Sequence, residues 1–387
     1  MLQRLHLLSA LALLFTTAAH AQQYQLTDIT PPGTTATASA LNMYGQSQVG
    51  GTVFVSGNFS LTNATIWNIS FLNGAAAAPI NLHPVALFDL SIGAGRSAIT
   101  GIAGISQVGY GSGPATSQQI RAVAWRGDAA SAAILPVPFA SFESKALGIG
   151  EDGIVGQIVG YANTVQTVGG RGTIHTFGGP PHAILWDEDS HNAVDIHNGA
   201  QGTVAVAAAF SKQVGYGGSW PPVTSSLLLE QPKAMMWNYP ARGINFVWLH
   251  PTQGYQSSAA LATDGIQEAG WAQLQSSGGR TTTALPTHAA VWMNTAASFV
   301  DLNPIGMVNS FALGVSQGKQ VGYGLDVNNF GHALVWSGSA ASAIDLNQYL
   351  PLGTTGAAAT SIDSSGNISG YMVIGTERHA IVWSIVQ

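Results

Sequence analysis

One pattern of polar and apolar positions returns seven times along the chain: a polar residue, an alanine, two mostly apolar residues and a tryptophan. Apolar runs of this kind predict short strands that are covered on both faces. Successive copies are 44 to 61 residues apart, and a repeat of this length is typical of a propeller or another array. The copies end at Trp67, Trp125, Trp186, Trp237, Trp292, Trp336 and Trp383.

Two further strand patterns accompany each tryptophan motif. One strand ends in glycine and then an aromatic residue, as in Gly109-Tyr110, and we read the first copy as Gly50-Gly51, without the aromatic ring. The other is an apolar-Asp-Leu strand, as in Asp301-Leu302. A weaker fourth element precedes each glycine strand, and a glycine such as Gly265 follows it, which is typical of a hairpin turn.

Each repeat therefore predicts four antiparallel strands of about four to six residues, which is the pattern of a propeller blade. Helical arrays are excluded because no 3.6-residue periodicity is found. The chain opens on an Asp-Leu-type strand and closes on a tryptophan strand. The sequence thus predicts an all-β fold, a seven-bladed β-propeller over residues 22–387, in which Gln22–Thr30 is the outermost strand of the last blade and closes the ring.

The residues within the tryptophan motif suggest separate roles. Its alanine is invariant among the copies, which indicates that a neighbouring blade packs closely against it. Its first residue can always donate a hydrogen bond, and we expect it to bind a backbone carbonyl or the Asp of the Asp-Leu strand. A metal-binding ring of histidines is the alternative that the pattern leaves open. These first residues are Asn63, Arg121, His182, Lys233, His288, His332 and His379.

Residues 1–21 predict a signal peptide, with Arg4 before an apolar stretch and Ala19-His20-Ala21 as the cleavage site. We therefore expect a secreted or periplasmic bacterial protein with no further membrane span. Cysteine is absent, and charged residues make up only 8% of the chain, with a net charge of −6. A surface with so few cations is a poor partner for nucleic acid. We expect a monomer and no cofactor or metal.

The motifs His182-Ala183, His288-Ala289, His332-Ala333 and His379-Ala380 resemble the HAF-type extracellular repeats of bacteria. Each is followed by an apolar pair and tryptophan, then by an Asp-Leu strand and a glycine-aromatic strand. The chain departs from that family because no copy has Phe after the alanine. The resemblance implies secretion and a repeat fold, and it implies no activity or site residues.

Candidate chemistry lies where the copies differ. The segments between the glycine and the tryptophan are longest in the third, fourth and fifth copies, and loops on a rigid scaffold commonly carry binding sites. These segments are expected to lie on one face as surface loops. Their aromatic, basic and acidic side chains suit a sugar or an acidic polymer. The candidate ligand-binding residues are Arg171, His175, Trp220, Glu230 and Arg280.

Known hydrolytic motifs are absent from the sequence, including Gly-x-Ser-x-Gly and His-Glu-x-x-His. The densest acidic cluster, Asp187-Glu188-Asp189, predicts a solvated turn rather than a cation site. We therefore expect a binding or structural scaffold for a glycan, a cell-surface component or a protein. The alternative is a carbohydrate-active hydrolase or lyase with His175 as base, Arg171 or Arg280 as charge stabiliser and Glu230 as acid.

Overall fold

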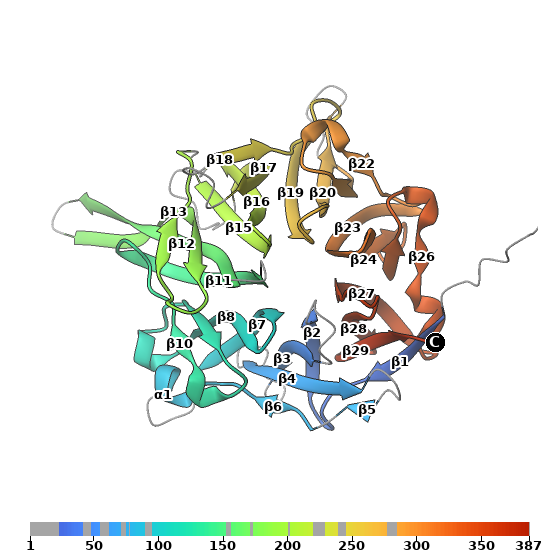
Figure 1. Ribbon diagram of the computed structural model, residues 1–387, viewed down its shortest axis with the longest axis horizontal. Coiled ribbons are helices and arrows are strands. Elements are labelled where there is room, and N and C mark those ends of the chain that lie inside the picture. The colour runs from blue at the N-terminus through green and yellow to red at the C-terminus, as the bar shows by residue number, and fades with distance from the viewer. Residues whose placement is uncertain are drawn as a thin grey trace, which may run out of the picture.

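The computed structural model describes residues 23–41, 48–54, 62–70, 75–76, 78–89, 95–151, 156–170, 173–199, 202–219, 229–238, 245–276 and 285–386. Within these ranges the chain is almost entirely β-strand, and the sheets stand side by side around a common centre (Figure 1). The predicted signal peptide, residues 1–21, lies outside the described residues.

The first half of the chain forms antiparallel sheets in strict chain order. The first contains β2 (Thr35–Leu41), β3 (Gln48–Phe54), β4 (Thr62–Ser70) and β5 (Ala75–Ala76), with β6 (Ile80–Asn81) also paired to β4. The second contains β7 (Arg96–Ala103), β8 (Ser106–Ser112), β9 (Arg121–Trp125) and β10 (Ala133–Ile134). The third contains β11 (Ser141–Glu151), β12 (Gly156–Gly170), β13 (Thr173–Asp187) and β14 (Ala193–Asp195).

The second half continues the same order. One sheet contains β15 (Gly202–Ala209), β16 (Lys212–Ser219), β17 (Glu230–Asn238) and β18 (Asn245–Trp248), and the next β19 (Tyr255–Thr263), β20 (Glu268–Leu274), β21 (Thr287–Trp292) and β22 (Val300–Asp301). The last, eight-stranded sheet contains β23 (Met307–Ser316), β24 (Lys319–Asp326), β25 (Gly331–Trp336), β26 (Ile344–Asp345), β27 (Thr354–Ile362), β28 (Ile368–Ile374), β29 (Glu377–Ile385) and β1 (Tyr24–Asp28).

This eight-stranded sheet consists of two four-stranded groups. A single parallel bridge between Gly331 and Gly356 joins β25 to β27. In the second group β1 pairs antiparallel with β29 over five residues, so that the first described strand and the last one are neighbours. The described residues contain few helices, all of them short: α1 (Val85–Phe88) and the 3-10 turns Pro114–Thr116, Ala129–Ser131, Ala296–Ser298, Ala340–Ser342 and Leu346–Tyr349. None of the helices in the described part of the chain has the length and hydropathy of a membrane-spanning segment.

The tryptophan motifs form the core between adjacent sheets, as the sequence predicts. All seven tryptophans and all seven motif alanines are at most 1% exposed. Trp237, for example, packs with Ala183, Leu185 and Ile196 of the preceding sheet. The alanine is small because the large ring of the next sheet lies against it. The Asp-Leu strands supply the third part of each contact, since their apolar residue after the Asp is buried.

The first strand of each unit carries a β-bulge, which explains the glycine of the second strand. In β7 the register shifts between Ile99 and Gly101. A Cβ atom on the facing Gly109 would stand 1.9 Å from the carbonyl oxygen of Ala98, so only glycine fits. The same distance is 1.9 to 2.1 Å at Gly51, Gly160, Gly215, Gly270, Gly322 and Gly370.

The first repeat is aligned differently from the sequence-based prediction. The glycine that faces the bulge is Gly51, not Gly50, because Gly51 pairs with Ala38 immediately before the register shift. The following residue, Thr52, pairs with the motif alanine Ala64, as Tyr110 pairs with Ala122. Thr52 therefore occupies the position that holds an aromatic ring in the other six repeats.

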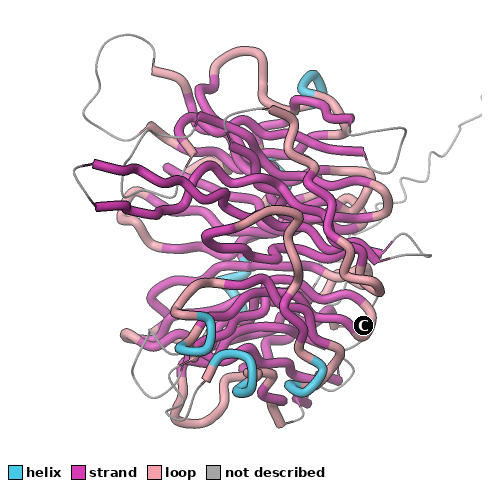
Figure 2. The backbone as a smooth tube through the Cα atoms, turned by 90° about the vertical axis from the view of Figure 1, so that its left-hand side faces the viewer, coloured by secondary structure: helices cyan, strands magenta, loops and turns pink. Residues whose placement is uncertain are grey.

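The strands are also longer than the expected four to six residues. Most first and second strands have seven to eleven residues, and β12 and β13 have fifteen each. The insertion at 162–181 was expected to be a surface loop. That prediction was wrong, because residues 162–170 and 173–181 continue the pairing of β12 with β13 and form a hairpin arm that projects from the body of the molecule (Figure 2).

The buried position opposite the tryptophan is glutamine in three repeats and glutamate in one. The side-chain amides of Gln107, Gln213 and Gln320 donate to the carbonyl oxygen two residues earlier, at 3.0 to 3.2 Å. Glu268 is fully buried, and its Oε2 accepts from the Asn294 N–H at 2.7 Å. Its Oε1 has no hydrogen-bond partner within the described ranges. Burial raises the pKa of Glu268, although Asn294 and Lys212 oppose the rise.

We expect Glu268→Gln to stabilise the fold at pH 7.5 by about 1 kcal/mol, because the new amide can donate where a carboxylate cannot. A raised carboxyl pKa gives stability that is complete below the unfolded pKa and is lost as pH rises through the folded pKa. The gain from Glu268→Gln should therefore shrink toward pH 4. Urea unfolding of both proteins at pH 7.5 and pH 4 measures the difference in stability. An equal or larger gain at pH 4 would contradict a raised pKa for Glu268.

Candidate functional site

The candidate face is the end of the sheets at which the second strand of each unit connects to the third. Each first strand starts at this face, each second strand ends there, and each third strand starts there, as β7, β8 and β9 illustrate. The residue after the bulge-facing glycine lies near the end of the second strand. The six aromatic side chains at this position are all partly exposed: Tyr110, Tyr161, Tyr216, Trp271, Tyr323 and Tyr371.

The structure describes only part of the sequence-predicted site. Arg171, Trp220 and Arg280 lie outside the described residues. His175 lies in β13 of the hairpin arm, where its backbone pairs with Val168. Glu230 is the first residue of β17, is exposed and pairs with Ser219. The roles proposed for these five residues, including catalysis by a hydrolase or lyase, stay predictions.

A pocket of about 390 Å³ lies on this face between the β15–β18 and β19–β22 sheets. We call it the Trp271 pocket. It is lined by the side chains of Tyr216, Leu229, Gln231, Pro232, Gln256, Ser257, Ala259, Leu261, Trp271 and Gln273. It adjoins the predicted segment at Glu230. Four of its residues, Leu229, Gln231, Pro232 and Gln273, lie in the long segments predicted for the fourth and fifth copies. The other six lie in strands that were not predicted to contribute to a site.

The polar side chains of the Trp271 pocket are held in place by hydrogen bonds. Gln256 Nε2 donates to Gln273 Oε1 at 2.8 Å, and Ser257 Oγ donates to the same oxygen at 3.1 Å. Gln273 Nε2 donates to the Leu285 carbonyl at 3.2 Å. Burial raises the pKa of Tyr216, so its hydroxyl is protonated at neutral pH and can donate. The pocket thus combines two aromatic rings with uncharged donors and acceptors.

The motif histidines bind the Asp of the Asp-Leu strand, which confirms the predicted donor role for four of the seven positions. The Nδ1–Oδ2 distances are 2.6 to 2.9 Å in His182–Asp195, His288–Asp301, His332–Asp345 and His379–Asp28. The other oxygen of each Asp accepts a backbone N–H two residues later. Within the described ranges, no group of three or more His, Asp or Glu side chains has the arrangement of a metal site.

The remaining motif residues follow this pattern less closely. Arg121 donates to the carbonyls of Ile120 and Phe142, each at 3.1 Å, which also agrees with the prediction.

The Asp partners of the motif histidines are charged, as Asp195 illustrates. Burial alone would raise the pKa of Asp195, but hydrogen bonds from His182 and the His197 N–H lower it. Asp195 is therefore a carboxylate at neutral pH and fixes the start of the third strand.

The sequence analysis did not predict a role for a second group of histidines, those that follow an Asp-Leu strand. His83, His197 and His250 follow the Asp-Leu strand, and their Nδ1 atoms lie 2.8 to 2.9 Å from the hydroxyls of Ser97, Thr203 and Ser258. Each hydroxyl also accepts the N–H of a motif alanine in the preceding sheet, at 2.9 to 3.0 Å. These chains of hydrogen bonds join neighbouring sheets. In the sequence, these histidines could have been recognised as polar residues that directly follow the buried Leu or Ile of an Asp-Leu strand.

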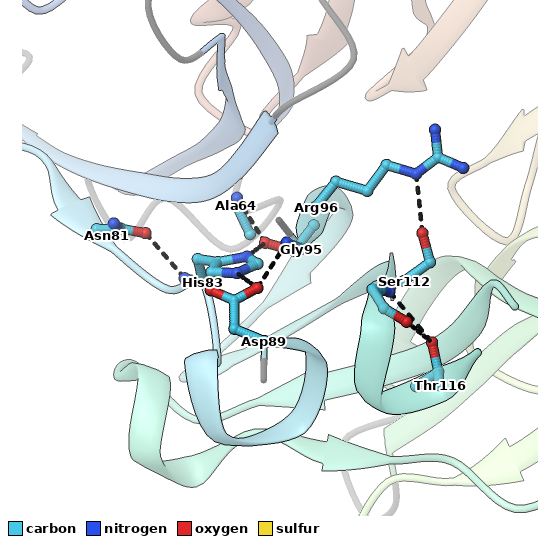
Figure 3. A network of polar contacts seen from close by, with 10 residues as sticks. Ala64, Asn81, His83, Asp89, Gly95, Arg96, Ser112 and Thr116 are labelled. Atoms are coloured by element: carbon cyan, nitrogen blue, oxygen red, sulfur yellow. Dashed lines mark hydrogen bonds and ion pairs between the residues drawn. The ribbon is translucent and has the colours of Figure 1, made fainter. Parts of the chain in front are cut away.

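His83 also lies 3.5 Å from Asp89 (Figure 3). Together with the Ser97 contact, this makes a Ser–His–Asp arrangement. Its role is structural. Ser97 is 1% exposed, and its oxygen already accepts from the Ala64 N–H. A nucleophile needs access to substrate and a free oxygen lone pair aimed at it. The same hydroxyl–imidazole contact recurs at His197 and His250, where it joins sheets in the same way.

The acidic cluster forms a turn, as predicted. Asp187 Oδ1 accepts from the Ser190 N–H and hydroxyl, each at 2.7 Å. Asp189 pairs with Arg126 at 2.7 Å, and both side chains are well exposed. Exposed pairs of this kind contribute little to stability.

No family model matches the sequence, and the comparison with curated proteins returns no match. Among solved structures, the chain is similar to the β-propeller domain of the Trilobed protease from Pyrococcus furiosus, which is described as having an open Velcro topology. The TM-score is 0.52 at 9% sequence identity, over 90% of this chain and 95% of that one. Oligogalacturonate lyase from Vibrio parahaemolyticus gives 0.49 at 10% identity, over 94% and 98%. The first likeness supports the fold alone, an all-β propeller architecture built from four-stranded antiparallel sheets.

Proposed function

We propose that the sheets form seven blades and that β1 closes the ring. Three supporting observations involve the first and last units. Ala380, Val382 and Ile29 cluster with Trp67 and Ala38, which is the pairing of motif alanine and tryptophan found between consecutive sheets. Thr360 Oγ1 donates to the Ala38 carbonyl at 2.9 Å, as Thr100 Oγ1 donates to the Ala146 carbonyl at 2.9 Å. A central cavity of about 290 Å³ is lined by the bulges of β2, β7, β11, β15, β19, β23 and β27.

We further propose that the protein is a secreted or periplasmic, monomeric binding scaffold of the HAF-repeat type, with a neutral glycan as its ligand. The Trp271 pocket carries this proposal. Its indole and phenol rings can stack on the apolar faces of sugar rings, and its amides and hydroxyl can bind sugar hydroxyls. A rigid repeat fold whose connecting segments differ between repeats commonly carries such binding sites. The leader-like residues 1–21 support secretion.

Trp271→Ala tests this function. Binding of neutral hexasaccharides of glucose, mannose and xylose to the chain from residue 22 is measured by calorimetry. Loss of a central aromatic contact is expected to weaken the best ligand about 30-fold, which corresponds to about 2 kcal/mol.

Trp248→Ala is the matched control, because Trp248 is 40% exposed on β18 and does not line the pocket. It should bind as tightly as the unmodified protein. Binding that survives Trp271→Ala, or that none of the hexasaccharides shows while the fold is intact, would refute a neutral-glycan function for this pocket.

A further inference from the structure

A second pocket on the same face has a different chemistry. Its volume is about 560 Å³, and it lies between the β2–β5, β7–β10 and β11–β14 sheets. We call it the Arg96 pocket. Its polar and aromatic walls include Thr37, Thr52, Phe54, Arg96, Tyr110 and Lys145.

The pocket is open because the first repeat lacks its aromatic ring. Thr52 stands at the position of Tyr110, Tyr161 and the other partly exposed rings, and it pairs with Thr37. A ring in this position would occupy part of the space in front of the second sheet. The first repeat thus offers two hydroxyl groups where the others offer a phenol or an indole.

Arg96 begins β7 and is held by one end of its guanidinium. Its Nε donates to Ser112 Oγ at 2.8 Å, and the side chain points away from the His83–Asp89 pair (Figure 3). The side chain is exposed. Anchoring through Nε leaves the two terminal nitrogens in the fork geometry that matches a carboxylate.

Lys145, in β11 of the next sheet, supplies a second cation. Its Nζ lies 4.8 Å from the ring centre of Tyr110 and 5.9 Å from that of Tyr161. In six of the seven repeats the residue that pairs with this ring position is uncharged: Thr37, Ala98, Val204, Ala259, Phe311 and Ala358. Lys145 is the exception, and its cation is fixed over an aromatic face rather than free in solvent.

Among the described residues, neither Arg96 nor Lys145 takes part in an ion pair. The buried Glu143, two residues before Lys145, instead accepts from the Tyr161 hydroxyl at 2.9 Å. The two cations lie in the same pocket although the chain has fewer basic residues, 12, than acidic residues, 18. A concave site with two such cations attracts anions.

We propose that the Arg96 pocket binds the carboxylate of an acidic sugar, a uronate unit of a polysaccharide. Arg96 takes the carboxylate through its terminal nitrogens, and Lys145 adds the second charge. Phe54 and Tyr110 offer ring faces to the sugar, and Thr37 and Thr52 offer hydroxyls to its hydroxyl groups. The site uses none of the residues of the Trp271 pocket and is thus a second site beyond the proposed function.

The Arg96 pocket lies next to the central cavity. Ser39 and Thr100 line both the Arg96 pocket and the central cavity, and Leu261 lines both the central cavity and the Trp271 pocket. The three cavities are therefore neighbours, and a polymer is the kind of ligand that could contact more than one of them.

The test is calorimetric titration of the chain from residue 22 with a tetrasaccharide of glucuronic acid, with its methyl ester, and with inorganic phosphate. The unmodified protein should bind the acid at least 10-fold more tightly than the ester. Arg96→Gln and Lys145→Gln should each weaken binding of the acid about 10-fold and leave binding of the ester unchanged.

Arg126→Gln is the matched control, because it removes one exposed cation beyond the other end of β9. It should bind the acid as the unmodified protein does. Equal binding of acid and ester, or full binding by Arg96→Gln with an unchanged melting curve, would overturn the proposal. Displacement of the tetrasaccharide by equimolar phosphate would overturn the sugar assignment and indicate a phosphate ligand. Trp271→Ala separates this result from the neutral-glycan function, since it should leave the acid-selective component intact.

Discussion

A chain that starts at residue 31 instead of residue 22 is expected to melt at a much lower temperature. It loses the five-residue pairing of β1 with β29 and the buried side chains of Tyr24 and Ile29, each 5% exposed. It also loses Thr30 Oγ1, which accepts from the Ala380 N–H at 2.8 Å, and the partner of His379. The Ala380 N–H would then be left without its acceptor in a largely buried position, which adds to the penalty.

Burial of an apolar side chain of this size contributes about 1.5–3 kcal/mol. The two side chains and the lost hydrogen bonds together predict a loss of about 4–6 kcal/mol, and a fall in melting temperature on the order of 10 °C. Scanning calorimetry of the two chains measures it. Gln25→Ser is the control, because Gln25 lies on β1 with its side chain exposed. An unchanged melting temperature in the truncated chain would refute ring closure by β1.

The repeat made most of the fold predictable. Seven tryptophans, each with an invariant alanine three residues before it, predicted the tight packing between sheets, because the same contact recurs and constrains the same residue types. The bulge was not predictable, since its sequence signature is only a glycine in the facing strand. For the same reason the first repeat was misaligned by one residue, at the pair Gly50 and Gly51.

The sites were less predictable than the fold. The long segments between the second and third strands predicted Arg171, Trp220 and Arg280 as site residues, and all three lie outside the described residues. Both pockets are lined largely by residues of strands in adjacent sheets, and such neighbours are far apart in sequence. The sequence feature that points to the Arg96 pocket is a residue in one repeat that differs in type from the equivalent residues of the other repeats. Lys145 and Thr52 are such departures, and they become visible only when the register of the strands is known.

Replacement of an intersheet tryptophan is expected to have a similarly large effect, and the size should depend on its indole N–H. Trp292 is 1% exposed and packs with Val214, Ala234 and Leu249 of the preceding sheet. Trp292→Ala leaves a cavity the size of the ring, so we expect a loss of about 3–5 kcal/mol in the free energy of unfolding. Trp248→Ala, on an exposed tryptophan, should change it by less than about 0.5 kcal/mol.

Substitution by phenylalanine separates packing from hydrogen bonding. The Trp292 N–H has no partner among the described residues, whereas the Trp186 N–H donates to the Pro136 carbonyl. Trp292→Phe loses ring volume and removes an unpaired buried N–H. Trp186→Phe loses the same volume and leaves the Pro136 carbonyl without its donor. Urea unfolding should therefore show Trp186→Phe to be more destabilising by about 1 kcal/mol. If the two phenylalanine variants are equally stable, the Trp186 hydrogen bond contributes nothing, and the seven tryptophans act through packing alone.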